Sequence, residues 1–102
     1  MSRRPFVAGN WKMNKGPNEA DALARELKSA LADQTAVDVA VAPTFVALST
    51  VTARLKHSGV QVAAQDIHPQ TSGAFTGAVS GEMVRQLGVT YTIVGHSERR
   101  AL

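Results

Sequence analysis

The sequence contains no cysteine, few aromatic residues and no long apolar run. The absence of cysteine excludes disulfide bonds, thiol catalysis and thiolate metal sites from these residues. Aromatic residues make up 5% of the chain, so the stacking platforms typical of single-strand nucleic-acid binding are missing despite a net charge of +3. No apolar run reaches the roughly 18 residues that cross a bilayer, so we expect neither a nucleic-acid nor a membrane partner.

What remains is the composition of one globular domain. The chain has 102 residues, of which 44% are hydrophobic and 19% charged, whereas disordered chains are poorer in apolar residues. The basic pair Arg3-Arg4 precedes only a short apolar stretch at residues 6–8, which is not the pattern of an export signal. We therefore expect a cytoplasmic protein whose mild positive charge favours anionic small molecules.

Two hydrophobic periodicities alternate along the chain. Four segments rich in β-branched or aromatic residues have the pattern of strands, namely residues 6–9, 37–42, 60–64 and 91–94. Three segments between them have the pattern of helices, namely residues 18–33, 44–57 and 80–87. Asn18 is the expected N-cap of the first helix, and Gly88 is the expected C-cap of the third. In the second helix, the residues expected to face inward are Phe45, Leu48, Val51 and Leu55.

This order of elements, β-α-β-α-β-α-β, predicts parallel strands joined by right-handed crossovers. Near-continuous apolar strands favour a sheet that is covered on both faces. A doubly wound open sheet and part of an eight-stranded β/α barrel both fit, and periodicity does not separate them. The long irregular segment at residues 66–79 is either a functional loop or a mobile surface loop, with similar weight for each.

Candidate chemistry lies at the carboxyl ends of the first and fourth predicted strands. Asn10 and Lys12 alternate along an extended segment and so share a face, where the lysine offers a cation for a phosphate or an oxyanion. Taken alone, such a lysine is more often a solvated surface residue. His96 and Glu98 follow the fourth strand and share a face if the extended conformation persists. The histidine is a candidate electrophile or acid–base catalyst, although a lone histidine is more often a buried, hydrogen-bonded one. Glu98 fits equally well as a structural ion-pair partner for a nearby arginine or lysine. The three histidines lack metal-ligand spacing, so no metal site is expected.

Longer motifs decide between these alternatives. The segment AGNWKMN at residues 8–14 resembles the first-strand signature of triosephosphate isomerases, and IVGHSERR at residues 93–100 resembles their fourth-strand signature. Three shorter segments lie between these motifs. VAP at 41–43 is similar to the end of the family's strand 2, AQD at 64–66 to the end of strand 3, and GAFTG at 73–77 to the long third loop. The resemblance spans essentially the whole chain.

This resemblance implies the first half of a parallel (β/α)8 TIM barrel, with residues 1–102 forming the N-terminal half of a single domain. It implies a cofactor-free isomerase of glycolysis and gluconeogenesis, which interconverts dihydroxyacetone phosphate and D-glyceraldehyde 3-phosphate through an enediolate. On the family pattern, His96 is a neutral electrophile. Lys12 holds the anionic substrate and stabilises transition-state charge, Asn10 contacts the substrate, and Glu98 positions the lysine and assists proton movement.

The resemblance also implies partners. In the family the third loop enters a second subunit, so Met13, Asn14, Gln65 and Thr76 are expected at a homodimer interface. Strands 5–8, the glutamate base, the lid and the late phosphate-binding loops match no residue here, so we expect the isolated chain to be inactive. We expect it to associate with a complementary C-terminal half or with itself. The alternative class is a non-catalytic phosphate-binding half-barrel or a self-assembling scaffold.

Overall fold

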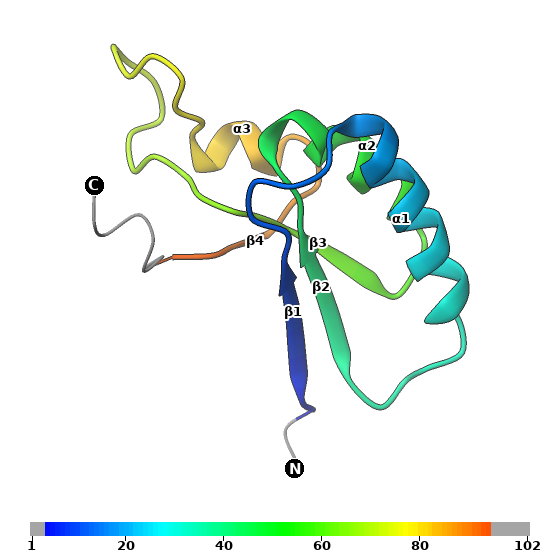
Figure 1. Cartoon of the computed structure of the whole chain (residues 1–102). Helices are drawn as coiled ribbons and strands as arrows, with labels where there is room; N and C mark the ends of the chain where they lie inside the picture. The colour runs from blue at the N-terminus through cyan, green and yellow to red at the C-terminus, as the bar shows by residue number, and fades with distance from the viewer. Residues whose placement is uncertain (1–3, 95–102) are drawn as a thin grey trace.

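The structure, a computed structural model, describes residues 4–94 of the chain. Strands and helices alternate along it as the periodicities predict (Figure 1). The strands are β1 (Phe6–Asn10), β2 (Asp38–Ala42), β3 (Val60–Ala64) and β4 (Tyr91–Thr92). The helices are α1 (Pro17–Ala30), α2 (Phe45–Leu55) and α3 (Gly81–Arg85).

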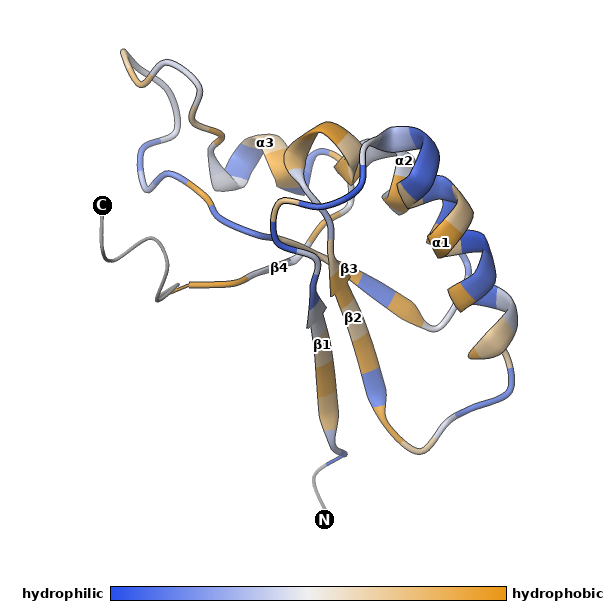
Figure 2. Cartoon of the chain, in the orientation of Figure 1, coloured by the Kyte–Doolittle hydropathy of each residue, from blue (hydrophilic) through white to orange (hydrophobic). Residues whose placement is uncertain are grey.

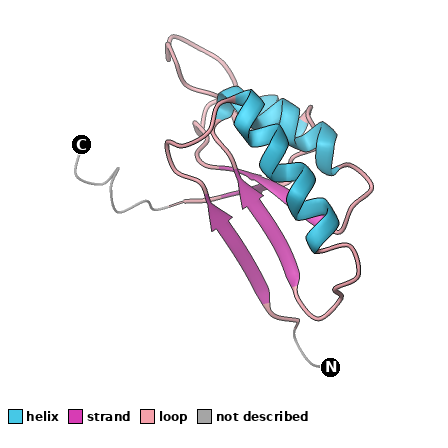
Figure 3. Ribbon diagram, turned by 45° about the vertical axis from the view of Figure 1, so that its right-hand side comes forward, coloured by secondary structure: helices cyan, strands magenta, loops and turns pink. Residues whose placement is uncertain are grey.

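The four strands form one parallel sheet in the order β1-β2-β3-β4. Each strand pairs with the next one in the sequence, as in a barrel; in an open doubly wound sheet the order reverses at one point. The sheet curls, and α1 and α2 lie together against one of its faces (Figure 3). This arrangement is half of a TIM barrel, which confirms the predicted fold class.

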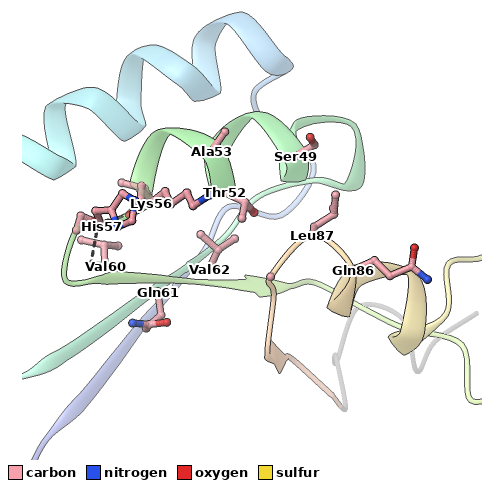
Figure 4. Close-up of a pocket in the computed structure, with 13 residues that line it drawn as sticks. Ser49, Thr52, Ala53, Lys56, His57, Val60, Gln61, Val62, Gln86 and Leu87 are labelled. Carbon is pink, nitrogen blue, oxygen red and sulfur yellow. Dashed lines mark hydrogen bonds between the residues drawn. The ribbon is translucent and has the colours of Figure 1, made fainter.

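Side chains alternate between the two faces of the sheet. On the outer face, Val41 and Val62 are buried among the apolar residues of α1 and α2, including Ala24 and Val51. The close-up in Figure 4 shows Val62 pointing toward α2 and Gln61 pointing to the opposite, concave side. The core therefore lies between the helices and the outer face, and the concave face carries the side chains that fill a complete barrel.

The concave face is not fully covered by the described residues. Phe6 is 50% exposed and Tyr91 is 45% exposed, and Val7 on the outer side of β1 is 54% exposed. Figure 2 shows the apolar character of β1 extending along the open edge of the sheet. Among the described residues, β1 therefore stays partly exposed on both of its faces, and the expectation of strands covered on both faces does not hold for it.

The first helix begins earlier than the sequence pattern predicts. Its N-cap is Gly16 rather than Asn18, and Pro17 is the first helical residue. Proline suits this position because the first turn of a helix does not need its N–H, and its fixed φ is helical. The Glu19 carboxylate accepts a hydrogen bond from the Gly16 N–H at 2.9 Å, which fixes the start of the helix.

The other element boundaries shift by a few residues. The third helix ends at Arg85 with Gln86 as its C-cap; Gly88, the expected cap, lies two residues further on with a φ of 91°. Phe45 is 37% exposed instead of facing inward, and Ala47 is buried in its place. Each difference concerns a helix end, where local hydrogen bonds outweigh the periodic pattern. None of the described helices is both long and apolar enough to span a membrane.

Candidate functional site

The candidate site lies at the carboxyl ends of β1, β2 and β3. In parallel β/α folds this is the edge where loops from successive strands converge. Asn10 is the last residue of β1, half-buried and on the concave side of the sheet. Its side-chain oxygen accepts a hydrogen bond from the Lys12 N–H at 2.9 Å, so the strand turns sharply at this point. The structure thus places Asn10 and Lys12 on one tight turn.

Lys12 adopts a backbone conformation that lysine rarely takes. Its φ is 53°, in the left-handed region that costs a non-glycine residue roughly 1–2 kcal/mol. The Gln65 side-chain amide donates to the Lys12 carbonyl oxygen at 2.6 Å and to the Ala42 carbonyl oxygen at 2.9 Å. One amide from the end of β3 therefore ties together the turns that follow β1 and β2. This anchoring keeps the lysine turn in its strained conformation.

Further hydrogen bonds complete the turn. The Asn14 amide donates to the Trp11 carbonyl oxygen at 2.8 Å, and the Trp11 N–H donates to the Ala42 carbonyl oxygen at 3.1 Å. Met13 is 92% exposed between these fixed points. Lys15 is a second left-handed lysine, with a φ of 73°. Two lysines, Lys12 and Lys15, thus lie in the segment that follows β1, and a lysine ammonium group is a suitable ligand for an anion.

The remaining candidate residues lie elsewhere. Thr76 is exposed in the long loop after β3, which extends away from the strand ends (Figure 1). The structure therefore does not bring Thr76 into the Asn10–Lys12 turn of the same chain. His96 and Glu98 lie outside the described residues. Their expected positions next to Lys12 stay predictions.

Sequence reasoning missed what Gln65 does within the chain. We expected this residue only at a subunit interface, whereas its amide joins two strand ends of its own chain. The available signal was its position: it follows β3 directly, at the same edge as Asn10 and Lys12. A long amide side chain there is within reach of the neighbouring carbonyl groups.

An open groove among the described residues is a different feature. It has a volume of about 560 Å³ and lies on the outer face, between α2 and the segment after α3 (Figure 4). Leu55, Val60, Val62 and Leu87 contribute apolar surface, and Lys56 and His57 lie at its rim. It lies on the opposite side of the sheet from Asn10 and shares no residue with the candidate site.

Resolved pKa shifts occur away from the strand ends. The Arg54 guanidinium donates two hydrogen bonds to the Asp21 carboxylate, at 2.8 and 3.1 Å. These bonds lower the pKa of Asp21 and raise the pKa of Arg54. The pair joins α1 to α2, so it is structural. Across residues 4–94, no three histidine or acidic side chains gather as a metal site would require.

Comparison with known proteins extends this picture. Residues 5–102 match the model of the family described as triosephosphate isomerase. The chain is 53% identical over 100 residues to the triosephosphate isomerase of Syntrophotalea carbinolica, which covers 98% of this chain and 40% of that protein. It is 52% identical over 99 residues to that of Carboxydothermus hydrogenoformans (97% and 39%) and 47% identical over 100 residues to that of Streptococcus thermophilus (98% and 40%). It thus spans about two fifths of the length of these relatives. A match across nearly all of its residues, together with the half-barrel fold, shows that the chain belongs to the triosephosphate isomerase family.

Proposed function

We propose that this chain supplies the substrate-holding and electrophilic side of a triosephosphate isomerase site. The reaction interconverts dihydroxyacetone phosphate and D-glyceraldehyde 3-phosphate through an enediolate, in glycolysis and gluconeogenesis in the cytoplasm. Lys12 holds the anionic substrate and Asn10 contacts it. His96 donates a hydrogen bond from a neutral imidazole to the enediolate oxygens, and Glu98 positions the lysine.

The observation that carries the proposal is the anchored lysine turn. Lys12 is held at both its N–H and its carbonyl group, by Asn10 and Gln65 respectively, in a left-handed conformation. Strain of this kind persists only where surrounding contacts over-determine it, and it gathers at functional sites. A fixed backbone gives the flexible lysine side chain a defined origin from which to reach a phosphate or an oxyanion.

The proposal assigns the catalytic base to the part of the barrel that this chain does not supply. Positioned acid–base catalysis contributes on the order of 10²–10⁴-fold in rate. The chain alone is therefore expected to show no appreciable turnover of glyceraldehyde 3-phosphate in a coupled assay. Turnover close to that of a complete family member would refute this division of roles.

Reconstitution tests the proposal directly. The chain is mixed with a polypeptide that supplies the remaining three fifths of the Syntrophotalea carbinolica relative, and isomerase activity is measured. We expect activity to appear with the intact chain and to fall by at least about 100-fold with Lys12→Met. Lys15→Met is the matched control, because Lys15 is the second exposed, left-handed lysine of the same turn. Equal losses in both variants would contradict a specific role for Lys12.

A complete barrel built from this half is proposed to form a homodimer. Met13, Asn14, Gln65 and Thr76 are the proposed interface residues. The exposed side chain of Met13 and the extended loop that carries Thr76 support this assignment. A second subunit packing over them would exclude water from the lysine turn.

A non-catalytic function is the second candidate. The partly exposed apolar rings of Phe6 and Tyr91 on the concave face favour a half-barrel that assembles with itself. Stable self-assembly, combined with no gain of activity on mixing with the remaining part of the barrel, would support such a scaffold over the split isomerase.

A further inference from the structure

The long loop after β3 is held closed by contacts within itself. At its base, the His68 N–H donates to the Val79 carbonyl oxygen at 2.7 Å, and His68 forms a parallel bridge with Ser80. Near its tip, the rings of His68 and Phe75 stack with their centroids 3.9 Å apart and their planes 31° apart. The loop thus has a fixed base and an aromatic contact that joins the base to the tip.

Glycine allows the chain to wrap around this contact. Gly73 has a φ of 138°, and a Cβ added there would lie 2.8 Å from the Phe75 ring. A Cβ would fit only if the ring moved, and a side chain would be strained at this φ even then. On the other side of Phe75, the Ala78 N–H donates to the Phe75 carbonyl oxygen at 2.9 Å. Phe75 is therefore held by contacts within its own loop while it stays 44% exposed, and Thr76 follows it directly.

The protonation state of His68 is part of this arrangement. Its Nδ1 atom accepts a hydrogen bond from the Gln70 N–H at 3.0 Å. A ring nitrogen that accepts carries no proton, so the imidazole is neutral, with its proton on Nε2. A second proton on Nδ1 would place two N–H groups face to face and break this bond. Histidine is the side chain that ordinarily changes charge between pH 8 and 5.

We propose that His68, Gly73 and Phe75 form a clasp that folds the loop before it docks onto a second copy of the protein, and that the closed clasp requires neutral His68. The inference rests on the proposed function, which places Thr76 at the homodimer interface. A loop ordered in advance loses less conformational entropy on docking, so the clasp strengthens dimerisation without touching the partner. His68 and Phe75 are positioning residues in this scheme.

Within residues 4–94, few charged groups line the hollows beside His68. Within the loop, Asp66 lines the same hollow as His68, and α2 contributes only Phe45 to it. From α3, Met83 lies beside the loop, while the charged residues Glu82 and Arg85 pair with each other at 3.0 Å. Asp66 is thus the carboxylate that lines this hollow with His68, and the pH dependence is to be measured with Asp66 intact.

Hydrogen exchange in the reconstituted barrel tests the clasp itself. Amide protection at Gln70 and Ala78, corrected for intrinsic exchange rates, is compared at pH 8 and pH 5. We expect protection at Gln70 to fall about fivefold or more at pH 5, the effect of one lost hydrogen bond. His68→Asn is the matched control, because its side-chain oxygen can accept from Gln70 without titrating. In this variant the pH dependence should vanish.

Dimerisation is then measured on the same proteins by sedimentation at both pH values. In the parent, the dimer dissociation constant should be about fivefold higher at pH 5 than at pH 8. In Phe75→Leu, it should be about fivefold above the parent's pH 8 value at both pH values. In His68→Asn, it should not change with pH. Unchanged protection at Gln70, or an opened clasp with unchanged dimerisation, would overturn the inference. The variant Thr76→Arg distinguishes failure of this inference from failure of the proposed function. A dimer that tolerates Thr76→Arg would refute the proposed position of Thr76 at the interface. The hydrogen-exchange data would still report on the clasp.

Discussion

The rings of Phe6 and Tyr91 lie with their centroids 5.6 Å apart, although the two residues come from the outermost strands of the sheet. A flat four-stranded sheet would separate them by about three strand spacings, roughly 14 Å. The curl of the sheet therefore brings its two edges together across the concave face. This contact forms part of a barrel interior, although Phe6 and Tyr91 stay 50% and 45% exposed.

Loss of these rings should weaken association of the isolated chain. The double variant Phe6→Ser, Tyr91→Ser should self-associate more weakly, with a dissociation constant at least tenfold higher than that of the parent chain. The reason is that each buried aromatic ring stabilises a contact by about 1.5–3 kcal/mol. Met83→Ser is the control, since Met83 is 51% exposed on α3, away from the concave face. Sedimentation at several concentrations measures both. A parent chain that is monodisperse, monomeric and cooperatively unfolding would contradict the prediction at the outset.

The hydrogen bonds of Gln65 should matter for both stability and activity. Gln65→Leu leaves the carbonyl groups of Lys12 and Ala42 without this donor, at a cost of about 1–3 kcal/mol in the reconstituted barrel. Chemical denaturation measures the cost. Gln65→Glu is the informative partner, because an ionised carboxylate fills the same space but donates nothing. If Gln65→Glu were as stable and active as the parent, the amide would not be the anchor of the lysine turn.

The sequence predicted the architecture well because its signals were redundant. Each strand is a short apolar run, each helix a periodic stripe, and the motifs at residues 8–14 and 93–100 fixed the register of the whole chain. Helix ends were predicted less well. The start of α1 depends on the Glu19 carboxylate turning back to Gly16, a three-dimensional contact that an N-cap preference for Asn18 does not encode.

The same limit applies to the candidate site. The family pattern placed Asn10 and Lys12 at the end of β1, and the structure joins them through one hydrogen bond. The left-handed conformation of Lys12 was not predictable, because an isolated lysine disfavours it and one of the two hydrogen bonds that hold it comes from Gln65, 53 positions away. Likewise, periodicity gave His68 no role, since its contact with Phe75 arises only when the loop folds.

Acid should weaken the link between α1 and α2 through Asp21. The pKa of Asp21 is lowered below its ordinary value of 3.8, mainly by its hydrogen bonds to Arg54. A carboxylate with a depressed pKa in the folded state contributes stability above about pH 4, which is lost as the pH falls through the folded-state pKa. At pH 6, the unfolding midpoint of Asp21→Asn should therefore be slightly below that of the parent. At pH 2, the two midpoints should be equal. The exposed Asp33, replaced in Asp33→Asn, serves as the control. A difference that persists at pH 2 would assign the effect to packing instead.

Replacement of the two left-handed lysines by glycine should have the same effect on stability but different effects on activity. Lys12 and Lys15 have φ values of 53° and 73°, a region that glycine enters without steric cost. Relief of strain, offset by the greater flexibility of glycine in the unfolded chain, should make Lys12→Gly and Lys15→Gly each more stable by roughly 0.5–1 kcal/mol. Thermal unfolding of the reconstituted barrel measures this gain.

Only Lys12→Gly should also lose isomerase activity, because the strained backbone at Lys12 serves to position a cation at the strand ends. Loss of stability in Lys12→Gly would mean that the lysine side chain itself holds the turn, and retained activity would remove Lys12 from the proposed site.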